Sequence, residues 1–157
     1  MTYVIEGIDP APFRPLLAAD EADLAAALAR RVTATGKPGF PCRVTLEDVE
    51  PGETLLLVHH VSRDALTPYR SAYAIYVREE AGSPARYVDA VPPVMERRAL
   101  ALRGFSADAM LHAAALAAPG EADAAIRAML ADPAIATIDV HNAAHGCFVA
   151  RVGRSAA

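Results

Sequence analysis

The sequence is poor in cysteine, because Cys42 and Cys147 are the only two in 157 residues. Two cysteines cannot build the framework of several disulfides that holds small secreted proteins together, so a fold of that kind is excluded. We therefore expect both side chains to be free thiols in a reducing compartment. A chain of this length is the size of a single domain, and it buries enough apolar surface to fold without such bridges.

A long uninterrupted apolar run is also missing. Hydrophobic residues make up 54% of the chain, but alanine supplies much of that share, and the strongest run, 109–118, contains His112. A helix that crosses a bilayer needs about 20 consecutive apolar residues, so this run is too short to span a membrane. The N-terminus carries Glu6 and Asp9 where a secretory signal needs a basic flank and an apolar segment. We expect a soluble, cytoplasmic protein without membrane association.

Basic residues do not outnumber acidic ones. The net charge is −4 at pH 7, and the isoelectric point of the sequence is about 5.7. Proteins that bind nucleic acids need a basic surface that displaces counterions from the phosphates, so we expect no nucleic-acid partner. Lys37 is the only lysine, and the other basic residues are arginines, which suit bidentate contacts to carboxylate or phosphate groups.

Strand patterns recur along the whole chain. Apolar alternation and β-branched or aromatic residues predict strands at 2–8, 31–34, 54–61, 71–78, 98–105, 135–141 and 147–152. The most apolar of these, TLLLVHHV at 54–61, predicts an interior strand that is covered on both faces, with Leu57 in the core. The alanine-rich stretch 110–118 fits either a strand or a helix.

Helix signals are few and short. Asp20 caps a helix that runs through Leu28, the stretch 121–131 is amphipathic, and a short helical segment begins at Pro92. Thr45, followed by an aspartate three residues later, resembles the capping box of one helical turn. Because no repeat or linker divides the chain, we predict one α+β domain over residues 1–157, with an ordered core of about 3–152. It consists of a largely antiparallel sheet with two or three short helices packed against it.

The densest group of chemically useful side chains is the segment HNAAHGC at 141–147. Predicted strands flank it on both sides, which indicates a hairpin. Asn142 is a good cap for a single helical turn within the loop, and Gly146 supplies the positive φ that ends such a turn. A loop of this length is ordinary in hairpins.

The register of this hairpin decides which side chains meet. Apolar residues share one face when the pairs are Val140 with Phe148, Ile138 with Ala150, and Ala136 with Val152. The opposite face then pairs His141 with Cys147, and Asp139 lies one pleat away. A histidine beside a thiol favours the reactive thiolate, and a carboxylate behind the histidine fixes its orientation. The register thus predicts a candidate catalytic set of Cys147, His141 and Asp139.

Other interpretations of the histidines and of Cys147 stay open. Cys147 can be packed as a small hydrophobe while His141 bonds a loop carbonyl. His141, His145 and Cys147 can also ligate a metal, but a glycine interrupts the spacing and no Cys-x-x-Cys motif completes the set, so we expect no metal and no cofactor. His59 and His60 are adjacent on a strand, face opposite sides and cannot bind one ion together.

Arginines offer a binding hypothesis, because Arg43, Arg70 and Arg78 together would suit an anion pocket. Four motifs extend it: GFPCR at 39–43, PYR at 68–70, IYVR at 75–78 and HNA..GC..ARV at 141–152. As a set they resemble a bacterial family of uncharacterised proteins, domain of unknown function 1203, over about residues 3–152. The resemblance carries no assigned activity, and it implies these candidate binding residues: Cys42, Arg43, Tyr69, Arg70 and Asn142.

No complete catalytic signature is present in the sequence. The leading hypothesis is therefore a non-catalytic module that binds a small molecule or a protein. The alternatives are a cysteine-dependent enzyme that uses the pair Cys147 and His141, and a purely structural or assembly role. The sequence leaves the ligand, the partners and the oligomeric state unspecified.

Overall fold

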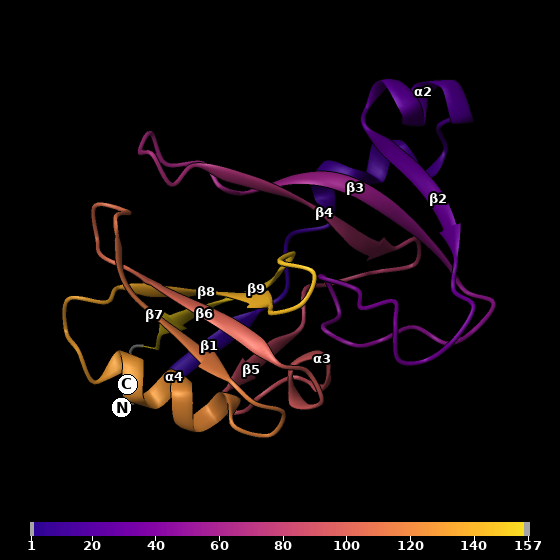
Figure 1. Ribbon diagram of the computed structural model, residues 1–157. Helices are drawn as coiled ribbons and strands as arrows, with labels where there is room; N and C mark the ends of the chain where they lie inside the picture. The colour runs from indigo at the N-terminus through magenta and orange to yellow at the C-terminus, as the bar shows by residue number, and fades with distance from the viewer. Residues whose placement is uncertain (1, 156–157) are drawn as a thin grey trace.

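Residues 2–155, which the computed structural model describes, contain nine strands in two antiparallel sheets and four short α-helices (Figure 1). From edge to edge, the larger sheet contains β5 (Arg86–Val88), β1 (Tyr3–Glu6), β9 (Phe148–Arg154), β8 (Thr137–Asn142), β6 (Leu100–Phe105) and β7 (Leu111–Ala117). The smaller sheet contains β2 (Ala29–Thr33), β3 (Thr54–Arg63) and β4 (Ser71–Arg78). The helices are α1 (Arg14–Leu17), α2 (Glu21–Ala26), α3 (Pro93–Glu96) and α4 (Ala122–Leu130), and a 3-10 turn, η1 (Ala11–Phe13), precedes α1. This is the predicted α+β class, with more helices than the two or three expected.

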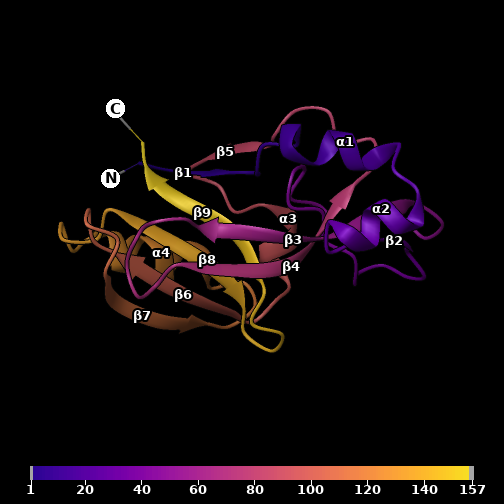
Figure 2. The same ribbon diagram turned by 90° about the horizontal axis from the view of Figure 1, so that it is seen from above.

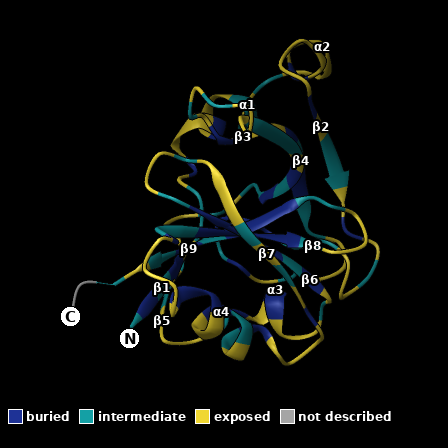
Figure 3. Ribbon diagram, turned by 60° about the vertical axis from the view of Figure 1, so that its left-hand side comes forward, coloured by how far each residue is buried: buried dark blue, intermediate teal, exposed yellow. Residues whose placement is uncertain are grey.

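The smaller sheet lies across one face of the larger sheet, and α4 covers the opposite face (Figures 1 and 2). Between the sheets, the Tyr73 ring contacts the His141 ring with centroids 4.9 Å apart. On the other side, Ile126 and Leu130 of α4 are buried against the larger sheet. Strands β8 and β9 are therefore covered on both faces, whereas β7 at the sheet edge is largely exposed (Figure 3).

Two separate hydrophobic clusters follow from this layering. One lies between the larger sheet and the helices α3 and α4. The other lies under β3 and β4, and it includes apolar residues of the N-terminal helices and of the segment 42–49. None of the helices within residues 2–155 is long and apolar enough to cross a membrane.

The predicted interior strand is the centre of the smaller sheet, because β3 pairs with both β2 and β4. Its apolar run is not covered on both faces along its whole length. Leu55, Leu56 and Val58 are buried, but Leu57 is only partly buried and lines two surface hollows. The prediction that Leu57 belongs to the core is wrong, because one face of the small sheet is open at this point.

Two further expectations are resolved by the structure, and one strand was missed. The ambiguous stretch 110–118 forms the edge strand β7, and the short strand β5 was not predicted. The capping box at Thr45 does not form a helical turn, because Leu46 adopts a φ of 55° and breaks the helical path. The Asp48 carboxylate instead accepts hydrogen bonds from the Gly39 amide at 3.1 Å and from Arg98 at 2.7 Å.

Strands β8 and β9 form the predicted hairpin but in a different register. Val140 pairs with Ala150 rather than with Phe148, and Asp139 pairs with Arg151. A β-bulge then shifts the pairing, so that His141 opposes Phe148. A bulge inserts one extra residue into a strand and reverses which face the following side chains occupy. Phe148 consequently joins the cluster under the smaller sheet, not the cluster that contains Val140.

Candidate functional site

Three segments that are distant in the sequence meet at one pocket, which we call the Arg43 pocket. They are the loop 39–43, strand β4 and the hairpin loop 142–147. The pocket encloses about 430 Å³, a volume typical of small-molecule sites. Its walls are formed by Gly39, Pro41, Arg43, Leu57, Tyr73, Ala74, Tyr76, Arg98, Asn142, His145 and Cys147.

The backbone of Arg43 is fixed on both sides. Its amide donates to the Tyr76 carbonyl of β4 at 3.0 Å, and its carbonyl accepts from the Ile8 amide at 2.9 Å. The chain approaches so closely here that a Cβ atom on Gly7 would lie 1.9 Å from the Val44 carbonyl oxygen. Only glycine fits at this position. The backbone around Arg43 therefore packs between the N-terminal segment and the edge of β4.

The side chain of Arg43 is buried, with 2% of its surface exposed. Its Nε donates to the Phe148 carbonyl at 2.8 Å, Nη1 to the Pro41 carbonyl at 2.5 Å, and Nη2 to the Cys147 sulfur at 3.2 Å. Burial, and to a lesser extent the neighbouring Arg98, lowers the pKa of Arg43, while Cys147 acts in the opposite direction. Because arginine does not deprotonate in proteins, the pocket wall carries a buried positive charge.

A second guanidinium group, that of Arg98, faces the same pocket. Its Nη2 donates to Asp48 at 2.7 Å and its Nη1 to the Val94 carbonyl at 2.8 Å. Burial raises the pKa of Asp48, but the hydrogen bonds from Arg98 and from the Gly39 amide outweigh it, so that this pKa lies below its ordinary value. Asp48 thereby connects Arg98 to the loop that carries Arg43.

The hairpin loop has the local structure that its sequence predicts. The Asn142 side-chain oxygen accepts hydrogen bonds from the amides of Ala144 at 3.1 Å and His145 at 3.3 Å. Gly146 adopts a φ of 74°, and its amide bonds the Asn142 carbonyl at 2.8 Å. Across the loop mouth, the Asn142 amide donates to the Cys147 carbonyl at 3.0 Å. Asn142, and not His141, is therefore the neighbour of Cys147 in the hairpin.

His141 is buried beneath this loop, with 2% of its surface exposed. Its Nδ1 lies 3.0 Å from the Gly146 carbonyl oxygen. A carbonyl can only accept, so the neutral ring carries its proton on Nδ1. Burial is the main cause that lowers the pKa of His141, and the bond to Gly146 only partly offsets it. His141 is thus a neutral side chain that holds the loop.

The three predicted catalytic residues contact separate partners. The Cys147 thiol is bonded to Arg43 and His141 to the loop carbonyl. The Asp139 carboxylate accepts from Arg63 at 2.9 Å and from Arg151 at 2.7 Å. The predicted cross-strand pair of His141 and Cys147 is wrong, because β8 and β9 pair two residues away from the predicted register, and the bulge then leaves His141 opposite Phe148.

The predicted binding residues are also divided. Cys42 is fully buried behind the pocket, and its sulfur accepts from the Arg78 amide at 3.3 Å. Tyr69 and Arg70 lie in the connection between β3 and β4, where Tyr69 packs against Phe105 with ring centroids 5.9 Å apart. Of the proposed binding set, only Arg43 and Asn142 line the Arg43 pocket.

The arginine trio predicted to form an anion pocket does not assemble. Arg70 pairs with the exposed Asp64 at 2.7 Å, and Arg78 pairs with Glu53 at 2.6 Å. Arg98 supplies the second guanidinium instead. Sequence reasoning missed it because its position depends on the packing around α3 and β6, and no motif marks it. Within residues 2–155, no three His, Cys, Asp or Glu side chains gather closely enough to hold a metal ion.

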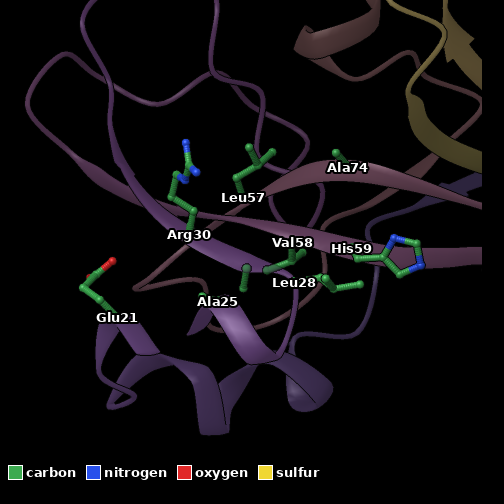
Figure 4. Close-up of a pocket in the computed structure, with 9 residues that line it drawn as sticks. Glu21, Ala25, Leu28, Arg30, Leu57, Val58, His59 and Ala74 are labelled. Carbon is green, nitrogen blue, oxygen red and sulfur yellow. The ribbon is translucent and has the colours of Figure 1, made fainter. Parts of the chain in front are cut away.

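A second hollow of about 630 Å³ lies between α2 and the strands β2 and β3 (Figure 4). It shares Leu57 and Ala74 with the Arg43 pocket, so the two hollows adjoin on the open face of the small sheet. Its charged residues, Glu21 and Arg30, are exposed, and Leu28 is 69% exposed. Because its lining has no buried charge and no thiol, the Arg43 pocket is the stronger candidate site.

Comparison with known proteins gives a family but no activity. Neither a curated protein nor a solved structure matches the chain. One family model, described as Protein of unknown function (DUF1203), matches residues 39–154, which is well over half of the sequence. The matched region begins with the loop that carries Arg43 and includes all residues that line the Arg43 pocket. The chain therefore belongs to the DUF1203 family.

Proposed function

We propose that the protein is a non-catalytic module that binds a small molecule with a carboxylate or similar anionic group in the Arg43 pocket. The observation that carries this proposal is the environment of Arg43. Its guanidinium is buried, and among residues 2–155 its bonds go to two carbonyl oxygens and a thiol, with no carboxylate partner. A buried charge without an opposite charge is costly. An anionic ligand in the pocket offsets that cost.

The remaining lining supports the same class of ligand. Arg98, which is paired with Asp48 through Nη2, adds a second planar guanidinium, a group that matches the geometry of carboxylate and phosphate oxygens. No aspartate or glutamate of the described chain lines the pocket. The side chains of Tyr73 and Tyr76 contribute aromatic surface, and Asn142 contributes a neutral polar group. A volume of about 430 Å³ suits a metabolite-sized molecule.

We further propose that the protein works in the cytoplasm and does not bind nucleic acid. A reducing cytoplasmic compartment fits Cys42 and Cys147, which are both free thiols in the structure. The net charge of −4 disfavours attraction to phosphate backbones. The positive charge that we assign to ligand binding is confined to the pocket.

Titration of the isotope-labelled protein with small anions tests the proposal by NMR. Succinate and inorganic phosphate are compared with succinamide, which has a similar shape but no charge. We expect saturable shifts at the amides of Arg98, Asn142 and Cys147 with the anions only. Removing one charged hydrogen bond costs about 1.5–3 kcal/mol, so Arg98→Gln should weaken binding roughly 10-fold to 100-fold.

The matched control is Arg97→Gln. Arg97 is the sequence neighbour of Arg98, is exposed, and does not line the Arg43 pocket. The substitution Arg97→Gln changes the net charge by the same amount as Arg98→Gln. A general electrostatic effect would therefore weaken anion binding equally in both variants. Equal shifts with succinate and succinamide, or no saturable shifts with any anion, would overturn the proposal.

A further inference from the structure

Cys147 lies on the wall of the Arg43 pocket, and we propose that it is a thiol-modification site. Its reaction partner is a small disulfide that carries carboxylate groups, with which it forms a mixed disulfide. This inference rests on the proposed anion binding, because the guanidinium groups that bind a carboxylate also orient the disulfide.

The two cysteines differ in the access that a reagent has to them. Cys147 is partly exposed and lines the pocket. Cys42 is fully buried, does not line the pocket, and has its sulfur bonded to the Arg78 amide. A molecule that enters the Arg43 pocket therefore meets the thiol of Cys147 and not that of Cys42.

The contact with Arg43 positions the Cys147 sulfur for this reaction. Nη2 donates to the sulfur at 3.2 Å, and the guanidinium is held in place by its bonds to Phe148 and Pro41. The thiolate is the form of a cysteine that attacks disulfides, and this contact holds the Cys147 sulfur at the pocket wall. Arg43 is a positioning residue here, since it acts through the sulfur.

The two guanidinium groups also select the reagent. Arg98 lines the same pocket as Cys147, and no acidic residue of the described chain lines it. Asp48 pairs with Arg98 from outside the lining and offsets part of its charge, so the uncompensated charge is that of Arg43. A positively charged cleft raises the association rate of anions by a factor of about 10 or more. A disulfide that carries carboxylates is therefore drawn to the sulfur, whereas a neutral disulfide is not.

The exchange step is balanced without any further oxidant. The Cys147 thiolate attacks one sulfur of the small disulfide, and a bond forms between Sγ and that sulfur. The original disulfide bond breaks, and its electron pair leaves with the second sulfur as a thiolate. Cys147 releases one proton to solvent when it forms the thiolate, and the leaving thiolate can take up one proton, so the protons balance. Cys147 is oxidised to a mixed disulfide, and half of the reagent is reduced to a free thiol.

Two chromogenic disulfides test the inference on the native protein. Ellman's reagent carries carboxylates, and dithiodipyridine is neutral near neutral pH. Each second-order rate constant is divided by that of free glutathione with the same reagent, which removes the intrinsic reactivity. We expect the normalised rate with Ellman's reagent to exceed that with dithiodipyridine by about 10-fold or more at low salt. High salt should remove most of this difference.

Variants assign the effect to the pocket. Cys147→Ser should abolish the fast phase with both reagents, which identifies the reacting sulfur. Arg98→Gln should slow the reaction with Ellman's reagent by a larger factor than the reaction with dithiodipyridine, whereas the control Arg97→Gln should change neither. A charge-independent rate in the unaltered protein, a fast phase that survives in Cys147→Ser, or labelling only after unfolding would overturn the inference.

The failure of this inference can be separated from the failure of anion binding. Cys147→Ser is titrated with succinate by the NMR method described above. If succinate binds but the thiol shows no preference for Ellman's reagent, only the thiol reaction is overturned. If succinate does not bind to either form of the protein, both proposals are overturned.

Discussion

His141 is a buried histidine whose hydrogen bond determines both its tautomer and the loop that follows it. Its ring packs edge-on against Tyr73 and Phe148, with centroids 4.9 and 5.9 Å away. Its Nδ1 is bonded to the Gly146 carbonyl, and Cys147 comes directly after Gly146. The side chain that the sequence marks as a candidate base therefore supports the loop that carries the thiol.

The burial of His141 predicts that acid destabilises the fold before carboxylates titrate. Burial lowers the pKa of both His141 and His60, so the folded protein keeps these rings neutral, whereas they titrate near 6.5 when unfolded. Below about pH 6.5 the unfolded state therefore binds more protons than the folded state. The stability that the neutral rings contribute is complete above that pH, and it is lost as the pH falls toward the lower pKa of the folded state. We expect the free energy of unfolding from urea titrations to fall between about pH 7 and about pH 5.5.

The substitution His141→Gln isolates this contribution. Glutamine does not titrate and can still donate a hydrogen bond to the Gly146 carbonyl, so the variant should show a shallower decline of stability with acid. His59→Gln is the control, because His59 lies on the exposed face of β3. An identical decline in the unaltered protein and in His141→Gln would contradict the assignment.

At the level of elements, β3 places neighbouring leucines in opposite environments. Leu56 is fully buried in the cluster under the smaller sheet, and Leu57 is partly buried at the surface hollows. Leu56→Ala should lower the free energy of unfolding by about 2–5 kcal/mol, since it leaves a cavity. Leu57→Ala should cost about 1 kcal/mol. Urea denaturation of the two variants measures this difference, and equal losses would contradict the face assignment.

The elements that the sequence predicts well are those with local causes. Asp20 caps α2 through a bond to the Asp23 amide, and the loop 142–147 follows from the side chain of Asn142 and the backbone freedom of Gly146. Alternation also identifies β8 and β9 as strands. These features depend on residues a few positions apart, and short-range chemistry is sufficient to specify them.

The features that sequence reasoning misses depend on contacts between distant segments. The register that places Phe148 rather than Cys147 opposite His141, and the bulge within it, leave no mark in the alternation of β9. Arg98 lines the Arg43 pocket because α3 and β6 position it there. Tyr76 lines the pocket because β4 forms an isolated bridge with Cys42 at this residue. The motifs predicted Arg43, Asn142 and Cys147 as chemically important residues, but only the tertiary structure gives the partner of each.

At the level of the whole molecule, the Arg43 pocket exists because two sheets are held together. Strand β4 of the smaller sheet contributes one wall, and the hairpin loop of the larger sheet contributes another. An ion cluster joins the sheets: Arg63 of β3 and Arg151 of β9 both bond Asp139 of β8. Arg151 also bonds the Ser62 carbonyl at 2.6 Å. The buried carboxylate of Asp139 thus holds the two sheets together, alongside the contacts of Arg43 with Phe148 and of Tyr73 with His141.

Asp139→Asn should therefore weaken the contact between the sheets and lower the free energy of unfolding. Asp139 is 2% exposed and Arg63 is 7% exposed, so the variant leaves a buried guanidinium without its opposite charge, which costs about 3–5 kcal/mol. Asp64→Asn is the matched control, because Asp64 pairs with Arg70 at an exposed site, and such pairs contribute about 0–1 kcal/mol. Urea denaturation measures both losses. Hydrogen exchange should show faster opening of β3 and β4 in Asp139→Asn only, and similar losses in the two variants would show that the ion cluster does not hold the sheets together.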